Sequence, residues 1–216
     1  MKVFLVVTRE YDQNCYCCFD QSTKEGVVID PGLNHEGIVS FIRGEEIKIK
    51  YILLTHAHFD HISGASEIKD YTNAPIVGHP SDAEILYDPK LNLSGGSYGS
   101  EISLSFDYLV SDGDVIAASG IELKVVATPG HTPGGLCFYS PQDSMIFTGD
   151  TLFWESVGRT DLPLGDGRLL TRSIKEKLLT LPGDTIVYPG HGRPTDIKHE
   201  RGIHQSMDSD MLRRTL

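Results

Sequence analysis

The sequence lacks a long uninterrupted run of apolar residues. None approaches the roughly eighteen residues that a membrane-spanning helix requires. The apolar stretch nearest the N-terminus runs only from Val3 to Val7. It is shorter than the core of a secretory signal peptide, and no small-residue cleavage site follows it. We therefore expect neither membrane association nor secretion, and we interpret residues 2–8 as a first strand.

Basic residues are also scarce. The chain has 19 Lys and Arg against 30 Asp and Glu, which gives a formal net charge of −11. A nucleic-acid-binding protein needs a basic face, so this balance argues against a nucleic-acid partner. An anionic substrate would have to meet a local positive group or a metal ion.

Cysteine occurs only four times, and three of the four lie close together. Cys15 and Cys18 form a C-x-x-C pair, but no second pair is available to complete a structural zinc site. The segment has the composition of a strand, so we expect Cys15, Cys17 and Cys18 to pack in the core. Free thiols in a chain that is not exported favour a cytoplasmic location.

At 216 residues, with neither a linker nor an internal repeat, the chain is predicted to be one domain, residues 1–216. Strands followed by helices recur roughly twice, which predicts two mixed β-sheets packed together with helices outside. The expected strands are 2–8, 15–19, 26–29, 49–54, 75–77, 106–110, 115–117, 121–128, 136–139, 145–148 and 185–188.

Helical segments are predicted between these strands. Asn34 is suited to cap a helix that runs to Arg43, and a second helix begins at Asp60 or Ser63. Ser81 with Glu84 matches a capping box for a short helix. Residues 169–181 are amphipathic at helical spacing, whereas residues 88–105 show little periodicity and are predicted to form a long loop.

Four buried strands end in residues that can bind a metal. Each of these residues lies one to seven positions beyond an apolar run, mostly on glycine-rich turns. Ligands at strand ends are held rigidly, as a catalytic metal site requires. The candidate ligands are His56, His58, Asp60 and His61 after strand 49–54, His131 after 121–128, Asp150 after 145–148 and His191 after 185–188.

Seven ligands exceed what one tetrahedral zinc ion can use. Five imidazoles and two carboxylates suit two divalent ions that share a bridging group. Thiolates are absent from the set, which argues against structural zinc. Imidazole and carboxylate donors suit zinc, iron, manganese or nickel, and the residues alone do not choose among these metals.

The segment His56-Ala57-His58-Phe59-Asp60-His61, with His131, Asp150 and His191 in this order, resembles the metallo-β-lactamase superfamily. Residues 148–153, 158–161 and 188–192 are similar to its glyoxalase II-like branch. The resemblance implies an α/β fold (α+β in some schemes), a four-layer αββα sandwich with two mixed β-sheets. It places one metal on His56, His58 and His131, a second on Asp60, His61 and His191, and Asp150 between them.

The same resemblance implies an activity: hydrolysis of a thioester such as S-D-lactoylglutathione by a metal-bound hydroxide. Asp60 would ligate the second metal and could accept a proton, and Arg159 would bind an anionic group of the substrate. A salt bridge of Arg159 to Asp161 or Asp166 is the alternative for this arginine. The substrate would be a small molecule, with glutathione as a candidate thiol. About 25 residues follow His191, so the helical C-terminal domain of full-length glyoxalase II is expected to be absent.

Two other readings remain open. Persulfide dioxygenases are similar in scaffold and use one iron, for which His56, His131 and Asp150 would form a two-histidine, one-carboxylate site. The non-enzymatic alternative is a metal-binding module without catalytic activity.

Overall fold

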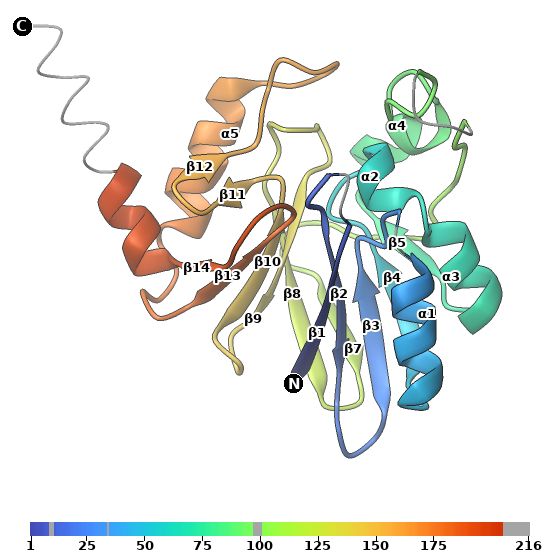
Figure 1. Ribbon diagram of the computed structural model, residues 1–216. Helices are drawn as coiled ribbons and strands as arrows, with labels where there is room; N and C mark the ends of the chain where they lie inside the picture. Colours follow the sequence, from blue (N-terminus) through green and yellow to red (C-terminus); the bar gives the residue numbers. More distant parts are fainter. Residues whose placement is uncertain (9–10, 34, 97–100, 205–216) are drawn as a thin grey trace, which may run out of the picture.

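Two six-stranded β-sheets lie face to face, with helices on the outside of each (Figure 1). A computed structural model describes residues 1–8, 11–33, 35–96 and 101–204. The predicted fold class, a four-layer αββα sandwich with two mixed β-sheets, is confirmed. A small hairpin, β11 (Leu152–Phe153) with β12 (Ser156–Val157), forms a separate two-stranded sheet.

The first sheet contains the N-terminal strands in sequence order. Its first three strands are antiparallel, and from β3 onward each strand pairs in parallel with the next. The parallel strands therefore deliver their carboxyl ends to one edge of the sheet. The strands are β1 (Lys2–Val7), β2 (Asn14–Phe19), β3 (Glu25–Ile29), β4 (Lys48–Leu53), β5 (Ile76–Gly78) and β6 (Tyr108–Leu109).

The second sheet has the order β14-β13-β10-β9-β8-β7. Only β10 and β13 are parallel, and they end at the same edge of the sandwich as β4. The strands are β7 (Val115–Ala118), β8 (Ile121–Ala127), β9 (Leu136–Ser140), β10 (Met145–Gly149), β13 (Ile186–Pro189) and β14 (Thr195–Asp196).

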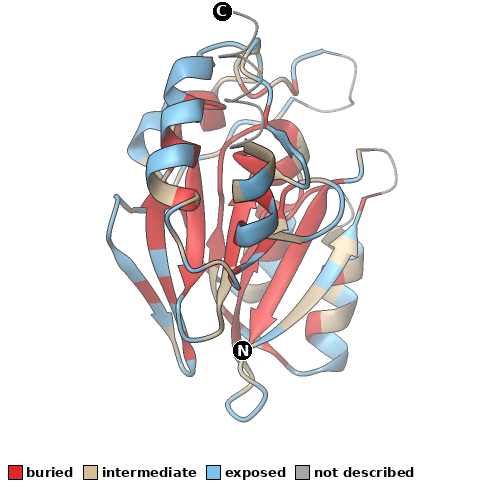
Figure 2. Cartoon of the chain, turned by 90° about the vertical axis from the view of Figure 1, so that its left-hand side faces the viewer, coloured by how far each residue is buried: buried red, intermediate tan, exposed pale blue. Residues whose placement is uncertain are grey.

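Helices cover the outer faces of both sheets (Figures 1 and 2). The helices that connect the parallel strands of the first sheet are α1 (His35–Gly44), α2 (Phe59–Ile62), α3 (Ala65–Thr72) and α4 (Ala83–Tyr87), with a 3₁₀ turn at Pro80–Asp82. The second sheet is covered by α5 (Gly167–Ser173), which continues as a π-helical turn over Ile174–Leu178, and by a helix over residues 197–204.

Three clusters of buried apolar residues lie between the four layers of the sandwich. In β8 the inward residues Ile121, Leu123 and Val125 are buried while Glu122 and Lys124 are exposed, as a strand with one solvent face requires. The buried residues of β8 pack against the inner face of the first sheet. A second cluster lies under α1 and α3, and a third lies under α5.

The cysteines are core residues. All four are buried and unpaired. Cys15 packs in the outer cluster under α1, whereas Cys18 packs between the sheets, so the C-x-x-C pair presents its thiols to opposite faces. Burial raises the pKa of Cys17 and of Cys137 to about 12, which keeps these thiols protonated.

Some local expectations were wrong. Ser81 caps no helix, because the chain makes a 3₁₀ turn at Pro80 and the His79 side chain accepts from Ser81 N. The predicted helix 169–181 begins at Gly167, where Asp166 caps it, and its α-helical part stops at Ser173. The predicted strand 106–110 shrinks to Tyr108–Leu109. The cap predicted at Asn34 lies outside the described residues.

In the described part of the chain, no helix is both long and apolar enough to cross a membrane.

Candidate metal centre

The structure brings all seven sequence-predicted ligands into one cluster. The loop after β4, with the first turn of α2, carries His56, His58, Asp60 and His61. Thr128 to Gly130 connect β8 to His131, Asp150 directly follows β10, and His191 follows β13 by two residues. The carboxyl ends of strands from both sheets thus meet at the seam between them.

Three buried histidines form the first group: His56, His58 and His131. His58 Nδ1 lies 2.9 Å from His131 Nε2, and the His56 ring packs edge-on against both others with centroids 4.9 and 4.7 Å away. The candidate ligand atoms of the three lie within 4.8 Å of one another.

Asp60, His61 and His191 form the second group. His191 Nε2 lies 3.2 Å from Asp60 Oδ2 and 3.2 Å from His61 Nε2. The distance from His61 Nε2 to Asp60 Oδ2 is 3.7 Å. Two ring nitrogens and one carboxylate oxygen therefore face a common point.

Asp150 lies between the two groups. Its Oδ2 is 3.6 Å from His131 Nε2 in the first group, and its Oδ1 is 3.3 Å from His61 Nε2 and 3.5 Å from His191 Nε2 in the second. One carboxylate with an oxygen toward each group is the arrangement that two adjacent cations need.

Hydrogen bonds behind the histidines fix which ring nitrogen faces inward. His131 Nδ1 donates to Arg159 O at 2.6 Å, and His191 Nδ1 donates to Tyr11 O at 2.8 Å. His61 Nδ1 donates to Asp30 Oδ2 at 2.9 Å. With Nδ1 protonated, each ring presents its Nε2 lone pair to the cluster, as outer partners of metal ligands do.

Asp30 is a residue of the site that the sequence analysis missed, because it assigned candidate ligands to the ends of four other strands only. It is buried and accepts three hydrogen bonds: from Thr55 N at 2.7 Å, from Thr55 Oγ1 at 2.6 Å and from His61. Thr55 Oγ1 in turn lies 3.1 Å from His56 Nδ1, from which it accepts. Asp30 directly follows β3, so the strand-end pattern could have identified it.

Asp82 was missed as well. It is buried and accepts from Ala57 N at 3.2 Å, Thr132 Oγ1 at 2.8 Å and Gly134 N at 2.6 Å. It therefore ties the backbone between His56 and His58 to the loop after His131. Burial raises the pKa of Asp82 to about 6.

The electrostatics of the two groups differ. Burial lowers the pKa of His58 to about 3, with His131 adding to the effect, and burial lowers the pKa of His56 well below its ordinary value. Burial also opposes a charge on His61, but the carboxylates of Asp60 and Asp150 outweigh it and raise the pKa of His61. His56 and His58 are thus neutral near pH 7, whereas the carboxylates of the second group favour a positive charge beside them.

The residues fit a pair of metal ions. Among the described residues, His56 Nε2, His58 Nε2 and Asp150 Oδ1 are buried and lack a hydrogen-bond partner. Buried polar atoms are normally satisfied, and these three lie in or beside the ligand groups. Imidazole and carboxylate donors suit zinc, iron or manganese. The clusters therefore fit a dinuclear metal site.

Glycine keeps the site open at Gly190. A Cβ on Gly190 would overlap Asp150 Oδ1 and the His61 ring. The space beside the second group thus depends on the absence of a side chain at this position.

Arg159 lies at the surface above the first group. Its Nε and Nη2 donate to Asp161 Oδ1 at 2.7 Å and Oδ2 at 2.8 Å, and both side chains are exposed. This is the salt bridge that the sequence analysis held as the alternative to substrate binding. The backbone carbonyl of Arg159, rather than its side chain, contacts a candidate ligand.

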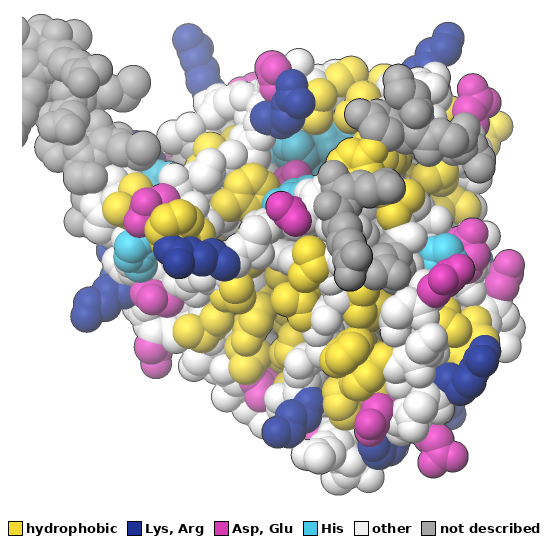
Figure 3. All heavy atoms as spheres, in the orientation of Figure 1, with side chains coloured by type: hydrophobic (Ala, Val, Ile, Leu, Met, Phe, Trp, Pro, Cys, Tyr) yellow, Lys and Arg dark blue, Asp and Glu magenta, His cyan; other side chains and the backbone are white. Residues whose placement is uncertain are grey.

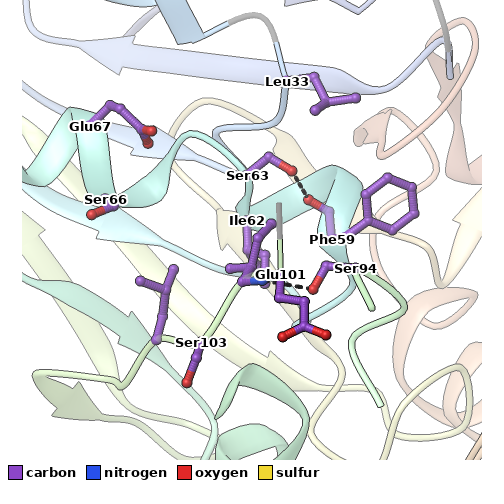
Figure 4. A pocket seen from close by; sticks show the side chains of 11 residues that line it. Leu33, Phe59, Ile62, Ser63, Ser66, Glu67, Ser94, Glu101 and Ser103 are labelled. Carbon is purple, nitrogen blue, oxygen red and sulfur yellow. Dashed lines mark hydrogen bonds between the residues drawn. The ribbon is translucent and has the colours of Figure 1, made fainter. Parts of the chain in front are cut away.

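A pocket of about 330 Å³ adjoins the metal centre on the other face of α2 (Figure 4). Phe59, Ile62 and Ser63 line it from α2, and Glu67 and Glu101 contribute carboxylates. In the space-filling view, histidine and acidic side chains emerge together on the upper part of the molecule, with apolar side chains around them (Figure 3).

Comparisons with known proteins agree with this geometry. The family model of the metallo-β-lactamase superfamily matches residues 10–191. Hydroxyacylglutathione hydrolase GloC of Haemophilus influenzae is 31% identical over 211 residues, covering 97% of this chain and 99% of that protein.

Solved structures give the same result. The BLEG-1 B3 metallo-β-lactamase has a TM-score of 0.88 at 35% identity, with 93% of this chain and 97% of that chain covered. TTHA1623 in a di-iron-bound form has a TM-score of 0.79 at 33% identity, with 92% and 96% covered. The chain belongs to the metallo-β-lactamase superfamily.

Proposed function

We propose that this protein is a metal-dependent hydrolase of thioesters such as S-D-lactoylglutathione. The observation that carries the proposal is Asp150, whose two oxygens face two separate histidine groups at 3.3 to 3.6 Å. The relatedness to a hydroxyacylglutathione hydrolase at 31% identity over nearly the whole chain supports the substrate class.

In this proposal His56, His58 and His131 hold one divalent ion, and Asp60, His61 and His191 hold a second, with Asp150 between them. Zinc is the first expectation, and iron or manganese would suit the same donors. The chemistry that bound divalent ions would supply is Lewis-acid activation of water and of the thioester carbonyl.

The chain's own residues prepare the site for that chemistry. Burial raises the pKa of Asp60, but His61 and His191 outweigh it and lower the pKa, so Asp60 is ionised near pH 7 and can accept a proton from the attacking water. Asp30 and Thr55 hold the His61 and His56 rings in orientation. Arg159, the residue that the sequence analysis expected to bind an anionic substrate group, has its guanidinium paired with Asp161.

The first experiment is metal quantification on protein purified without added metal, coupled to an assay panel. The panel contains S-D-lactoylglutathione, a neutral thioester, an oxygen ester and a β-lactam, each tested after loading with zinc, iron or manganese. The proposal expects about two ions per chain and fastest turnover of a thioester.

His58→Ala should abolish turnover and remove one ion. His79→Ala is the matched control, since His79 lies outside both ligand groups and its side chain accepts from Ser81 N in a neighbouring 3₁₀ turn. About one iron per chain with oxygen uptake on glutathione persulfide would instead establish the dioxygenase alternative. Metal-loaded protein that turns over nothing in the panel would favour the inactive metal-binding module.

A further inference from the structure

Arg193 lies close in sequence to His191 of the second ligand group and has no acidic partner among the described residues. Arg193 is exposed and follows His191 by two residues, so their Cα atoms are about 7 Å apart at most. The segment is anchored, because Asn14 Nδ2 donates to Pro189 O at 2.9 Å and to Gly192 O at 2.8 Å, on either side of His191.

The guanidinium of Arg193 rests on an aromatic ring. Its Cζ lies 3.5 Å from the centroid of the Trp154 ring. Trp154 follows Phe153, whose ring is edge-on to the His191 ring at 6.0 Å. Stacking orders the arginine and leaves its in-plane N–H donors free, as planar recognition of a carboxylate requires.

The charges around Arg193 leave it available. Within the described ranges no salt bridge involves it, whereas Arg159 is already neutralised by Asp161. The nearest carboxylate in sequence to Trp154, Glu155, accepts from His199 Nε2 at 3.0 Å. The buried Glu200 accepts from Glu155 N and from Thr195 Oγ1.

The opposite flank of the metal centre has the wrong charge for an anion. The pocket beyond α2 is lined by Glu67 and Glu101. On a chain of net charge −11, a carboxylate would be repelled there and attracted to Arg193.

We propose that Arg193, stacked on Trp154, is a subsite for a carboxylate of the substrate, which makes this protein selective for anionic thioesters. This inference rests on the proposed hydrolase function. The carboxylate could belong to the thiol part or to the acyl part of the thioester, and the probes below separate the two.

The kinetic test compares Arg193→Met with Arg172→Met, which removes an exposed arginine of α5 that pairs with Glu176 of the following π-helical turn. The probes are S-lactoylglutathione (carboxylates on the thiol), S-succinyl-N-acetylcysteamine (carboxylate on the acyl group) and neutral S-lactoyl-N-acetylcysteamine. A lost charge-assisted hydrogen bond corresponds to about a tenfold loss or more. We expect Arg193→Met to lower kcat/KM by that factor, mainly through KM, for one anionic probe and to leave the neutral probe unchanged.

Arg193→Lys should recover part of the loss, because a lysine keeps the charge without the planar fork. Equal loss on neutral and anionic probes would overturn the subsite. So would a selective loss in Arg159→Met that is absent in Arg193→Met.

A binding test does not depend on turnover. Trp154 is the single tryptophan of the chain, so its fluorescence reports on the stack directly. Metal-free protein is titrated with S-methylglutathione and with its dimethyl ester. The proposal expects a saturable change with the acid, and at least tenfold weaker binding with the diester or with Arg193→Met. Equal dissociation constants for acid and diester, together with no selective loss on the succinyl probe in Arg193→Met, would refute it.

The two proposals fail in different ways. Hydrolysis of thioesters that Arg193→Met leaves unchanged would refute the subsite but not the hydrolase function. Fluorescence that discriminates the probes, combined with no hydrolysis by metal-loaded protein, would remove the hydrolase function and leave the subsite.

Discussion

Asp82 makes the stability of this protein depend on pH in a way that one substitution should abolish. Its carboxylate is fully buried and holds Ala57, Thr132 and Gly134 together. Burial raises the pKa of Asp82 from 3.8 to about 6, so the folded protein binds this proton more tightly than the unfolded chain does. Stability from this group is therefore fully present below pH 3.8 and is lost as pH rises through 6.

The size of the effect follows from the two pKa values. They differ by about two pH units, and each unit corresponds to 1.36 kcal/mol. The unfolding free energy of the wild type should thus fall by about 3 kcal/mol between pH 4 and pH 7 because of Asp82 alone. In Asp82→Asn that contribution disappears, since an amide does not titrate.

The assay is urea unfolding of metal-free wild type and Asp82→Asn at several pH values from 4 to 7. Other titrating groups cancel in the difference between the two proteins. We expect the wild type to lose about 3 kcal/mol relative to Asp82→Asn across this range. Parallel curves would refute the reasoning, because they would mean that the carboxylate titrates alike in the folded and unfolded states.

Three further outcomes are expected. Asp30→Asn weakens the acceptor for His61 Nδ1 and should lower metal affinity about 10- to 100-fold, measured by competition with a zinc chelator, while the circular dichroism spectrum is retained. Gly190→Ala places a methyl group against Asp150 and His61 and should abolish turnover and reduce the bound metal; full activity would show that the site has more room than described. Metal binding should release protons, because carboxylates raise the pKa values of His61 and His191, so calorimetric heats should vary with the buffer's ionisation enthalpy and affinity should fall below pH 7.

The sequence analysis predicted the strands and the candidate ligands because both depend on residues that are close together in the sequence. Hydrophobic runs identify the strands, and His131, Asp150 and His191 each follow such a run by a few residues. The structure adds that these strand ends lie at one edge of the sandwich, where the ligand candidates converge. Their roles as ligands await the metal analysis described above.

The residues that organise the site could not be predicted in this way. Asp82 contacts Ala57 and Thr132, which are 25 and 50 positions away, and no local periodicity records such hydrogen bonds. Asp30 follows the predicted strand 26–29, and the sequence analysis assigned no candidate ligand to the end of that strand. In the segment 169–181, helical spacing indicated a helix, but it does not distinguish an α-helix from the π-helical turn at Ile174–Leu178.

The two sheets supply different parts of each ligand group. Four of the seven predicted ligands follow β4 in the first sheet, whereas His131, Asp150 and His191 follow strands of the second. Each of the two groups built on His131 and on His191 is therefore incomplete until both sheets have docked. Ions bound there would link the two sheets and raise the free energy needed to separate them. A chain still being synthesised could not complete the first group before residue 131, or the second before residue 191, has been added and folded, so metal loading should follow docking of the two sheets.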